Sequence, residues 1–157
     1  MITYILLFNF PLILYYFELK KKIIFDDLLK FYFLFLFFFI SLRYEVGGDF
    51  YSTSLSMLPL TSFYETFSTI TILNSILLYI AKLSSLDVFF YNSVASFIFC
   101  SIFYVFIKEF NNRSLILLIS FPIIILILAM GFTKQSIAFS FIILGILNFV
   151  REKYLIA

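Results

Sequence analysis

One stretch of the chain sets charges of both signs and a glycine pair directly after a long apolar run. The apolar run covers residues 31–42, and the stretch that follows reads Arg-Tyr-Glu-Val-Gly-Gly-Asp-Phe-Tyr from Arg43 to Tyr51. A guanidinium group suits a phosphate, and a glycine turn lets backbone N–H groups approach an anion closely. A neighbouring carboxylate suits the activation of a hydroxyl group. These residue types therefore predict chemistry on a phosphate-bearing substrate.

Four residues of this stretch are candidates for a site, and each has a structural alternative. Arg43 is a candidate catalytic residue, but an arginine at the end of a membrane span can also anchor its charge among lipid headgroups. Gly47 and Gly48 are candidate substrate-binding residues, and the alternative is a plain turn. Asp49 is a candidate catalytic residue, and a salt bridge or a cap is an equal alternative.

A second polar cluster, Gly131-Phe132-Thr133-Lys134-Gln135, interrupts two further apolar runs. An ammonium group near the middle of a bilayer costs about 2.5–3.5 kcal/mol on insertion scales, and this penalty fades near the interface. Lys134 and Gln135 are candidate substrate-binding residues, because a cation beside two amide donors suits an anion. For Lys134 the alternative is a role in membrane topology alone.

The composition places these residues in a membrane protein. Hydrophobic residues make up 64% of the chain and charged residues 13%, with a mean hydropathy of +1.12. Soluble domains have about 45–50% apolar and about 25% charged residues. The charges lie in short loops, where they act as topology signals, so nucleic-acid binding is excluded. The chain has no histidine, and its single cysteine, Cys100, lies in an apolar run, so we expect no metal site, disulfide or cofactor.

The apolar runs predict an all-α fold, a polytopic transmembrane helix bundle of about five to six spans. The clear spans are predicted at residues 2–17, 26–42, 88–107, 115–130 and 136–150, with Pro122 tolerated as a kink. The first span is expected to be a retained helix, because no positive charge precedes it as in a signal peptide. Residues 52–65 are too polar to cross and are predicted to form a polar extracytoplasmic loop with interfacial helices.

The segment 66–83 is ambiguous, because one apolar stripe is accompanied by polar interruptions, so it could lie flat, re-enter or cross. If it crosses, the basic residues divide almost equally between the two sides of the membrane. If it does not, all of the 11 Lys and Arg residues except Arg43, Lys82 and Lys134 are cytoplasmic. The positive-inside rule favours the second arrangement. It predicts that the Arg43 stretch and the Lys134 cluster share the extracytoplasmic face and can form one site.

The two motifs resemble those of the EpsG family of bacterial exopolysaccharide and capsule polymerase-like membrane proteins, which are related in type to the Wzy O-antigen polymerases. The family pattern has an arginine followed by a Val-Gly-Thr-Asp-Tyr run, and later an Arg-Gln-x-Ile-Ala run that opens a span. The matching residues are Arg43, Val46, Gly47, Asp49, Gln135, Ile137 and Ala138. The departures are Gly48, Phe50 and Lys134, which stand where the family has Thr, Tyr and Arg.

This resemblance implies polysaccharide biosynthesis by a glycosyltransferase-type polymerase in the bacterial inner membrane. Such an enzyme joins polyprenyl-pyrophosphate-linked oligosaccharide units at the extracytoplasmic face. Arg43 and Lys134 would neutralise the diphosphate leaving group. Asp49 would orient or deprotonate the acceptor hydroxyl, and a base from elsewhere in the family architecture is the alternative. Other capsule-assembly membrane proteins are expected partners, besides the lipid bilayer.

The resemblance extends over the whole chain but over only the N-terminal portion of such a polymerase. We therefore expect residues 1–157 to form a single integral membrane domain of a longer architecture, and truncation to an inactive product is one expectation. The alternative function comes from a different class. It is a non-enzymatic polytopic membrane protein, such as a transporter fragment, a flippase fragment or a gene remnant.

Overall fold

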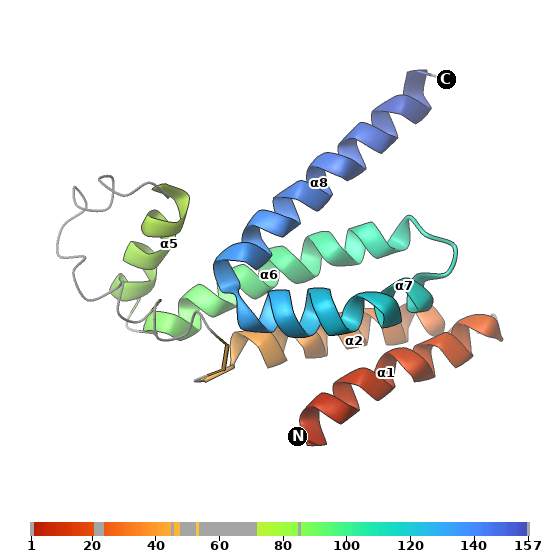
Figure 1. Cartoon of the computed structure of the whole chain (residues 1–157), viewed down its shortest axis with the longest axis horizontal. Helices are drawn as coiled ribbons and strands as arrows, with labels where there is room; N and C mark the ends of the chain where they lie inside the picture. Colours follow the sequence, from red (N-terminus) through yellow and green to blue (C-terminus); the bar gives the residue numbers. More distant parts are fainter. Residues whose placement is uncertain are drawn as a thin grey trace.

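The computed structural model describes residues 2–20, 24–44, 46–47, 53, 72–84 and 86–156. Within these ranges every regular element is a helix, which confirms the predicted all-α fold. Figure 1 shows the helices in chain order: α1 (Ile2–Leu19), α2 (Phe25–Ser41), α5 (Ile72–Leu83), α6 (Asp87–Lys108), α7 (Arg113–Ser120), the π-helix η1 (Phe121–Ala129) and α8 (Thr133–Ile156).

Two helical segments, Asp87–Lys108 and Thr133–Arg151, are long and apolar enough to cross a membrane. Helix α5 has 12 residues and is about 18 Å long, well short of a hydrocarbon core of about 30 Å. Residues 66–71 lie outside the described residues, so the preference for a segment 66–83 that does not cross stays a prediction. The number of about five to six spans stays a prediction. The predicted interfacial helices of residues 52–65 lie outside the described residues, Thr53 excepted.

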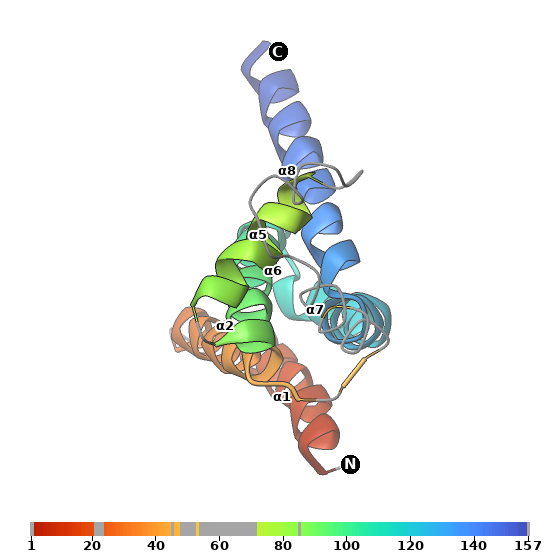
Figure 2. The ribbon, with the colours of Figure 1, turned by 90° about the vertical axis from the view of Figure 1, so that its left-hand side faces the viewer.

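Helix α6 is the central helix of the bundle. It packs against α2 and α8, and α5 and α7 also contact it. Buried aromatic rings join α2 to α6: the ring centroids of Phe33 and Phe103 lie 6.1 Å apart, and Phe103 stacks on Phe99 at 5.3 Å. Figure 2 views the bundle from one end and shows α2 and α7 on either side of α6, with α5 in front.

Large apolar side chains also cover the outside of the bundle. Phe97 is 64% exposed, Ile119 63% and Ile142 59%. Apolar surface costs about 25 cal/mol per Å² when exposed to water, but lipid tails are as apolar as these side chains. The outer faces of α6, α7 and α8 are therefore suited to hydrocarbon surroundings.

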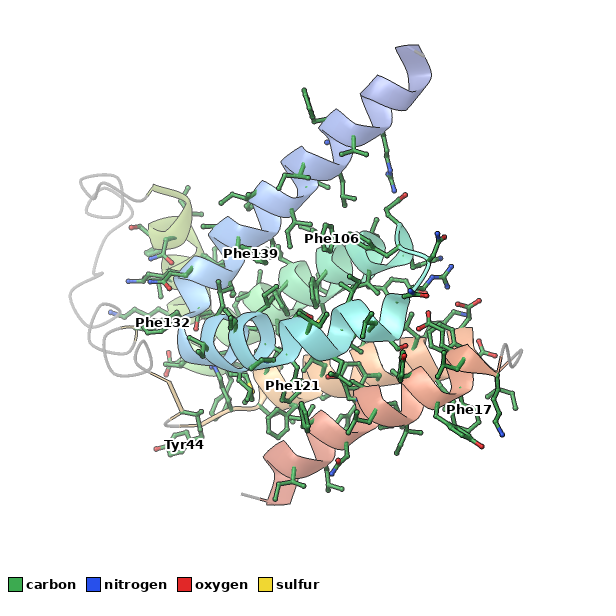
Figure 3. The ribbon with its side chains drawn as sticks, turned by 45° about the vertical axis from the view of Figure 1, so that its right-hand side comes forward. Phe17, Tyr44, Phe106, Phe121, Phe132 and Phe139 are labelled. Carbon is green, nitrogen blue, oxygen red and sulfur yellow. The ribbon has the colours of Figure 1, made fainter. Side chains whose placement is uncertain are left out.

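The helices run between two ends of different chemistry. At the end drawn on the left in Figure 1, α2 ends and both α6 and α8 begin. We call this the motif end, made of Arg43, Asn92, Met130 and Thr133, because it carries both sequence motifs. Figure 3 places Tyr44 and Phe132 at this end and Phe17, near the end of α1, at the opposite one.

The opposite end, which we call the basic end, is made of Glu18, Asp26, Glu109, Arg113 and Arg151. Arg113 Nη1 donates to Asp26 Oδ1 at 2.6 Å, and Arg151 pairs with Glu109. Glu18 of α1 also caps α7: Oε1 accepts from the backbone N–H of Arg113 at 2.7 Å, and Oε2 from that of Ser114 at 3.0 Å. A carboxylate here satisfies N–H groups that have no partner within the helix.

The helix that Glu18 caps changes from α-helical in α7 to π-helical in η1 near Pro122. A kink was predicted there, but the structure instead has a π-helix over Phe121–Ala129. Proline lacks the N–H that would continue the α-helical ladder, and π-turns accommodate such an interruption. The helix ends at Gly131, Phe132 breaks it, and α8 begins at Thr133. The predicted break is confirmed but is shorter than the sequence indicated.

Candidate functional site

Arg43 lies at the centre of the motif end. It follows the last turn of α2 and is only 7% exposed. Its Nη1 donates to the carbonyl oxygens of Ala129, at 3.0 Å, and Met130. Its Nη2 donates to Asn92 Oδ1, at 3.3 Å, and to Thr133 Oγ1. The side chain is directed into the protein, so a role as an anchor in the lipid headgroups does not describe this arginine.

The contacts of Arg43 explain why the chain can break after η1. The last carbonyl groups of a helix have no partner within the helix and carry the negative end of its dipole. A guanidinium placed on the carbonyls of Ala129 and Met130 satisfies them and favours the positive charge there. All four of these acceptors are neutral, and together they fix the orientation of the guanidinium beside the break.

Gly47 brings the backbone of the first motif against that of the second. Its φ angle of +93° is in the region that favours glycine. A Cβ atom added at this position would lie 2.6 Å from the carbonyl oxygen of Met130 and 2.7 Å from that of Gly131. Both distances are too short for a carbon atom. The structure therefore requires a glycine here for the close approach of two backbones, beyond the anion-binding or plain turn considered from the sequence.

Two members of the site were not singled out from the sequence. Asn92 of α6 is 2% exposed and Thr133 is 3% exposed, and both accept from Arg43. Asn92 Nδ2 is also buried and has no hydrogen-bond partner among the described residues. A buried donor without an acceptor costs about 1–3 kcal/mol. The signal was available in the sequence, because Asn92 is an amide within an apolar span, and polar residues in spans face the bundle interior.

An open, apolar pocket reaches the site from the side of α2. It has a volume of about 380 Å³. Its lining consists of Phe35, Phe38, Phe39, Leu42, Arg43, Val46 and Met130. Of the described residues that line the pocket, Arg43 alone is charged, so the pocket joins an aromatic surface to the guanidinium.

The other predicted site residues are placed less centrally. Lys134 and Gln135 lie in the first turn of α8, next to Thr133, and both side chains are exposed. They belong to the motif end, but no contact with Arg43 is formed. Gly48 and Asp49 lie outside the described residues, so the structure does not test their predicted roles. Cys100 is buried and unpaired, and the described residues hold no cluster of three or more metal-ligating side chains.

Comparison with known families decides the assignment of the two motifs. The model of the EpsG family matches residues 27–157, which is more than half of the chain and includes both motifs. The chain belongs to the EpsG family. This confirms the resemblance seen in the sequence and, together with the apolar helices, identifies a polysaccharide-related membrane protein. No curated protein and no solved structure matches the chain. In this EpsG-family chain, Arg43 joins the two segments that carry the resemblance.

Proposed function

We propose that this EpsG-family chain acts in polysaccharide biosynthesis as a Wzy-like polymerase. The reaction is the joining of oligosaccharide units carried on polyprenyl pyrophosphate, at the extracytoplasmic face of the bacterial inner membrane. The chain crosses this membrane about five to six times, with the basic end in the cytoplasm. Other capsule-assembly membrane proteins are its expected partners.

One observation carries the proposal: Arg43 of the first motif is hydrogen-bonded to Met130 and Thr133 at the second. The partners are 87 and 90 residues away in the sequence, and both motifs resemble those of a polymerase-like family. A buried guanidinium and the exposed ammonium of Lys134 at one end of a bundle suit a diphosphate. The hydrogen bonds of Arg43 therefore support one anion site shared by the two motifs better than two independent loops.

The proposed roles follow from the buried, hydrogen-bonded guanidinium of Arg43 and the exposed, flexible ammonium of Lys134. Arg43 supplies a preorganised positive charge, which is worth most in a water-poor site where negative charge develops on the leaving diphosphate. Lys134 supplies a cation on a flexible stem, although without the planar geometry of the arginine usual in the family. Gly47 and Gly48 shape the turn, and Gln135 adds amide donors. Asp49 orients or deprotonates the acceptor hydroxyl.

The proposal is tested with a gene deletion and complementation by tagged variants. Surface polysaccharide is separated on a gel, and the tagged protein in the membrane fraction is quantified by immunoblot. We expect the deletion to lose long polymer, the wild-type chain to restore it, and Arg43→Ala to be inserted but not to restore it. Arg113→Ala at the basic end is the matched control and should restore the ladder.

The alternative of a non-enzymatic membrane protein gives a different result. A deletion strain with an unchanged ladder would contradict the polymerase function itself. A restored ladder with Arg43→Ala would remove Arg43 from the mechanism while leaving the polymerase function in place. The proposed topology is tested by cysteine labelling from outside the cell in a Cys100→Ser background. Cysteines at the exposed positions Tyr44 and Lys134 should both be labelled, and labelling of only one would contradict the shared face.

A further inference from the structure

Asn92 has a donor that the described protein does not use. Its Oδ1 accepts from Arg43 Nη2 at 3.3 Å, while Nδ2 is buried without a hydrogen-bond partner among the described residues. The network fixes the orientation of the amide, because a flipped amide would set its NH₂ group against the guanidinium NH₂ group. Nδ2 and Oδ1 are bonded to the same carbon, so the unused donor lies beside the Arg43 charge.

The unused donor contrasts with the Nη donors of Arg43. Each Nη atom of Arg43 already makes two hydrogen bonds to the protein. A ligand oxygen that takes one of those hydrogens displaces a protein acceptor, whereas an oxygen that binds Asn92 Nδ2 displaces none. The apolar pocket reaches Arg43 from the side of α2, and Asn92 is hydrogen-bonded to Arg43 Nη2 directly behind that lining residue.

We propose that Asn92 is a ligand-contacting residue of the motif end, where Oδ1 positions Arg43 and Nδ2 donates to an oxygen of a bound diphosphate. This inference rests on the proposed function, which supplies the diphosphate. It adds helix α6 to a site that the sequence motifs assign only to the segment after α2 and to the break that leads into the first turn of α8. In this site Arg43 supplies the positive charge, and Asn92 fixes the position of one anionic oxygen of the ligand.

The substitution Asn92→Asp separates the two roles of the side chain. Aspartate keeps an oxygen for Arg43 and adds an opposite charge next to it, so the positioning of Arg43 is preserved or strengthened. It removes the N–H donor and places a negative charge against a diphosphate. The added carboxylate also compensates part of the Arg43 charge, so Thr133→Asp is the electrostatic comparison: it places a carboxylate at another acceptor of Arg43 Nη2 and keeps Asn92 Nδ2. A residue that only positions Arg43 would lose no more binding than this comparison variant, whereas a residue that also binds the ligand would lose more.

The test uses the full chain in phospholipid nanodiscs, titrated calorimetrically with inorganic pyrophosphate. We expect Asn92→Asp to weaken pyrophosphate binding at least tenfold more than Thr133→Asp does, while the unfolding temperature of Asn92→Asp without ligand stays equal to that of the wild type or rises. Asn74→Asp is the matched control, because Asn74 Oδ1 likewise accepts from a side chain of α6, Tyr91 Oη at 2.6 Å, outside the Arg43 contacts. It should bind pyrophosphate as the wild type does.

The outcomes distinguish this inference from the proposed function. Binding by Asn92→Asp equal to that of Thr133→Asp would overturn the inference alone. A wild-type chain that does not bind pyrophosphate would overturn both. If Asn92→Asp is not inserted, Asn92→Leu is compared with Thr133→Val, because each removes one acceptor of Arg43 Nη2 and only the first removes Nδ2: at least tenfold weaker binding than that of Thr133→Val is expected, and equal binding would overturn the inference.

Discussion

The two ends of the bundle hold arginines in opposite ways. At the basic end, Arg113 pairs with the carboxylate of Asp26 at 2.6 Å, and Arg151 pairs with Glu109. At the motif end, the two carbonyls, the amide and the hydroxyl that hold Arg43 are all neutral. Arg43 is 7% exposed, whereas the side chain of Arg113 is 28% exposed. The first arrangement neutralises charge near the surface, and the second orients a charge in the interior.

This difference separates stability from function. Exposed ion pairs contribute about 0.2–1 kcal/mol each, so the basic end holds helices together through several small contributions. A buried guanidinium is unfavourable unless it is hydrogen-bonded, and the hydrogen bonds of Arg43 connect the two motifs. We therefore expect substitutions at the motif end to affect polymer synthesis, and those at the basic end to affect stability alone.

The largest effect is expected for Arg43→Ala. The substitution leaves the carbonyls of Ala129 and Met130 and the side chains of Asn92 and Thr133 without their donor. We expect the free energy of unfolding to fall by at least about 2 kcal/mol, and long polymer to be lost. Arg43→Lys should be intermediate, because three donors on one nitrogen cannot match four spread acceptors. Chemical denaturation in detergent and the polysaccharide gel measure the two effects. Equal behaviour of Arg43→Ala and Arg113→Ala would contradict the contrast between the ends.

The next largest effect is expected for Gly47→Ala. A non-glycine residue in the left-handed region costs about 1–2 kcal/mol, and the added Cβ would also collide with the Met130 carbonyl. The two motifs should separate, and the polymer ladder should shorten. Gly145→Ala is the control, because a Cβ there meets nothing within 4 Å. That helical position should gain up to about 1 kcal/mol with an unchanged ladder.

A moderate effect confined to stability is expected for Glu18→Ala. The α7 N-terminus loses the carboxylate that accepts from the N–H groups of Arg113 and Ser114, and the loss of a helix cap costs about 0.5–2 kcal/mol. The unfolding temperature should fall while the polymer ladder is retained at permissive temperature. Glu18→Gln keeps a side-chain oxygen and should lose less. A ladder shortened at full protein level would show that the basic end also serves function.

The smallest effect is expected for Asp26→Asn. The Asp26 side chain is 62% exposed, and its pair with Arg113 should contribute less than about 1 kcal/mol and be screened by salt. Unfolding measured at low and high salt should differ between wild type and variant only at low salt. A loss that persists at high salt would show that this pair is not an ordinary surface ion pair.

The positions of the helices follow from the sequence because lipid imposes them. A span must be apolar over its length, so the runs at residues 2–17, 26–42 and 88–107 coincide with α1, α2 and α6. The break near Gly131 could be predicted for the same reason, because polar residues interrupt the apolar run there. Charge counting also indicated that Arg43 and Lys134 lie at one end of the bundle, and the structure places both there.

The contacts within the site could not be predicted in the same way. A helix that is apolar on all sides gives no periodic signal of the face it turns to its neighbours. The inward position of Asn92 therefore depends on the packing of α6 against α2 and α8. The acceptors of Arg43 include two backbone carbonyls, which no side-chain pattern reveals. The π-winding of η1 was missed because Pro122 signals an interruption without specifying its form.

The helix formed by α7 and η1 is fastened at both of its termini by side chains from other helices. Glu18 of α1 binds its first N–H groups, and Arg43, next to α2, binds its last carbonyls. A piston-like slip by one residue, about 1.5 Å, would break both fastenings at once. This helix is therefore a strut of fixed length between the motif end and the basic end, and sliding along its axis costs the contacts at both ends.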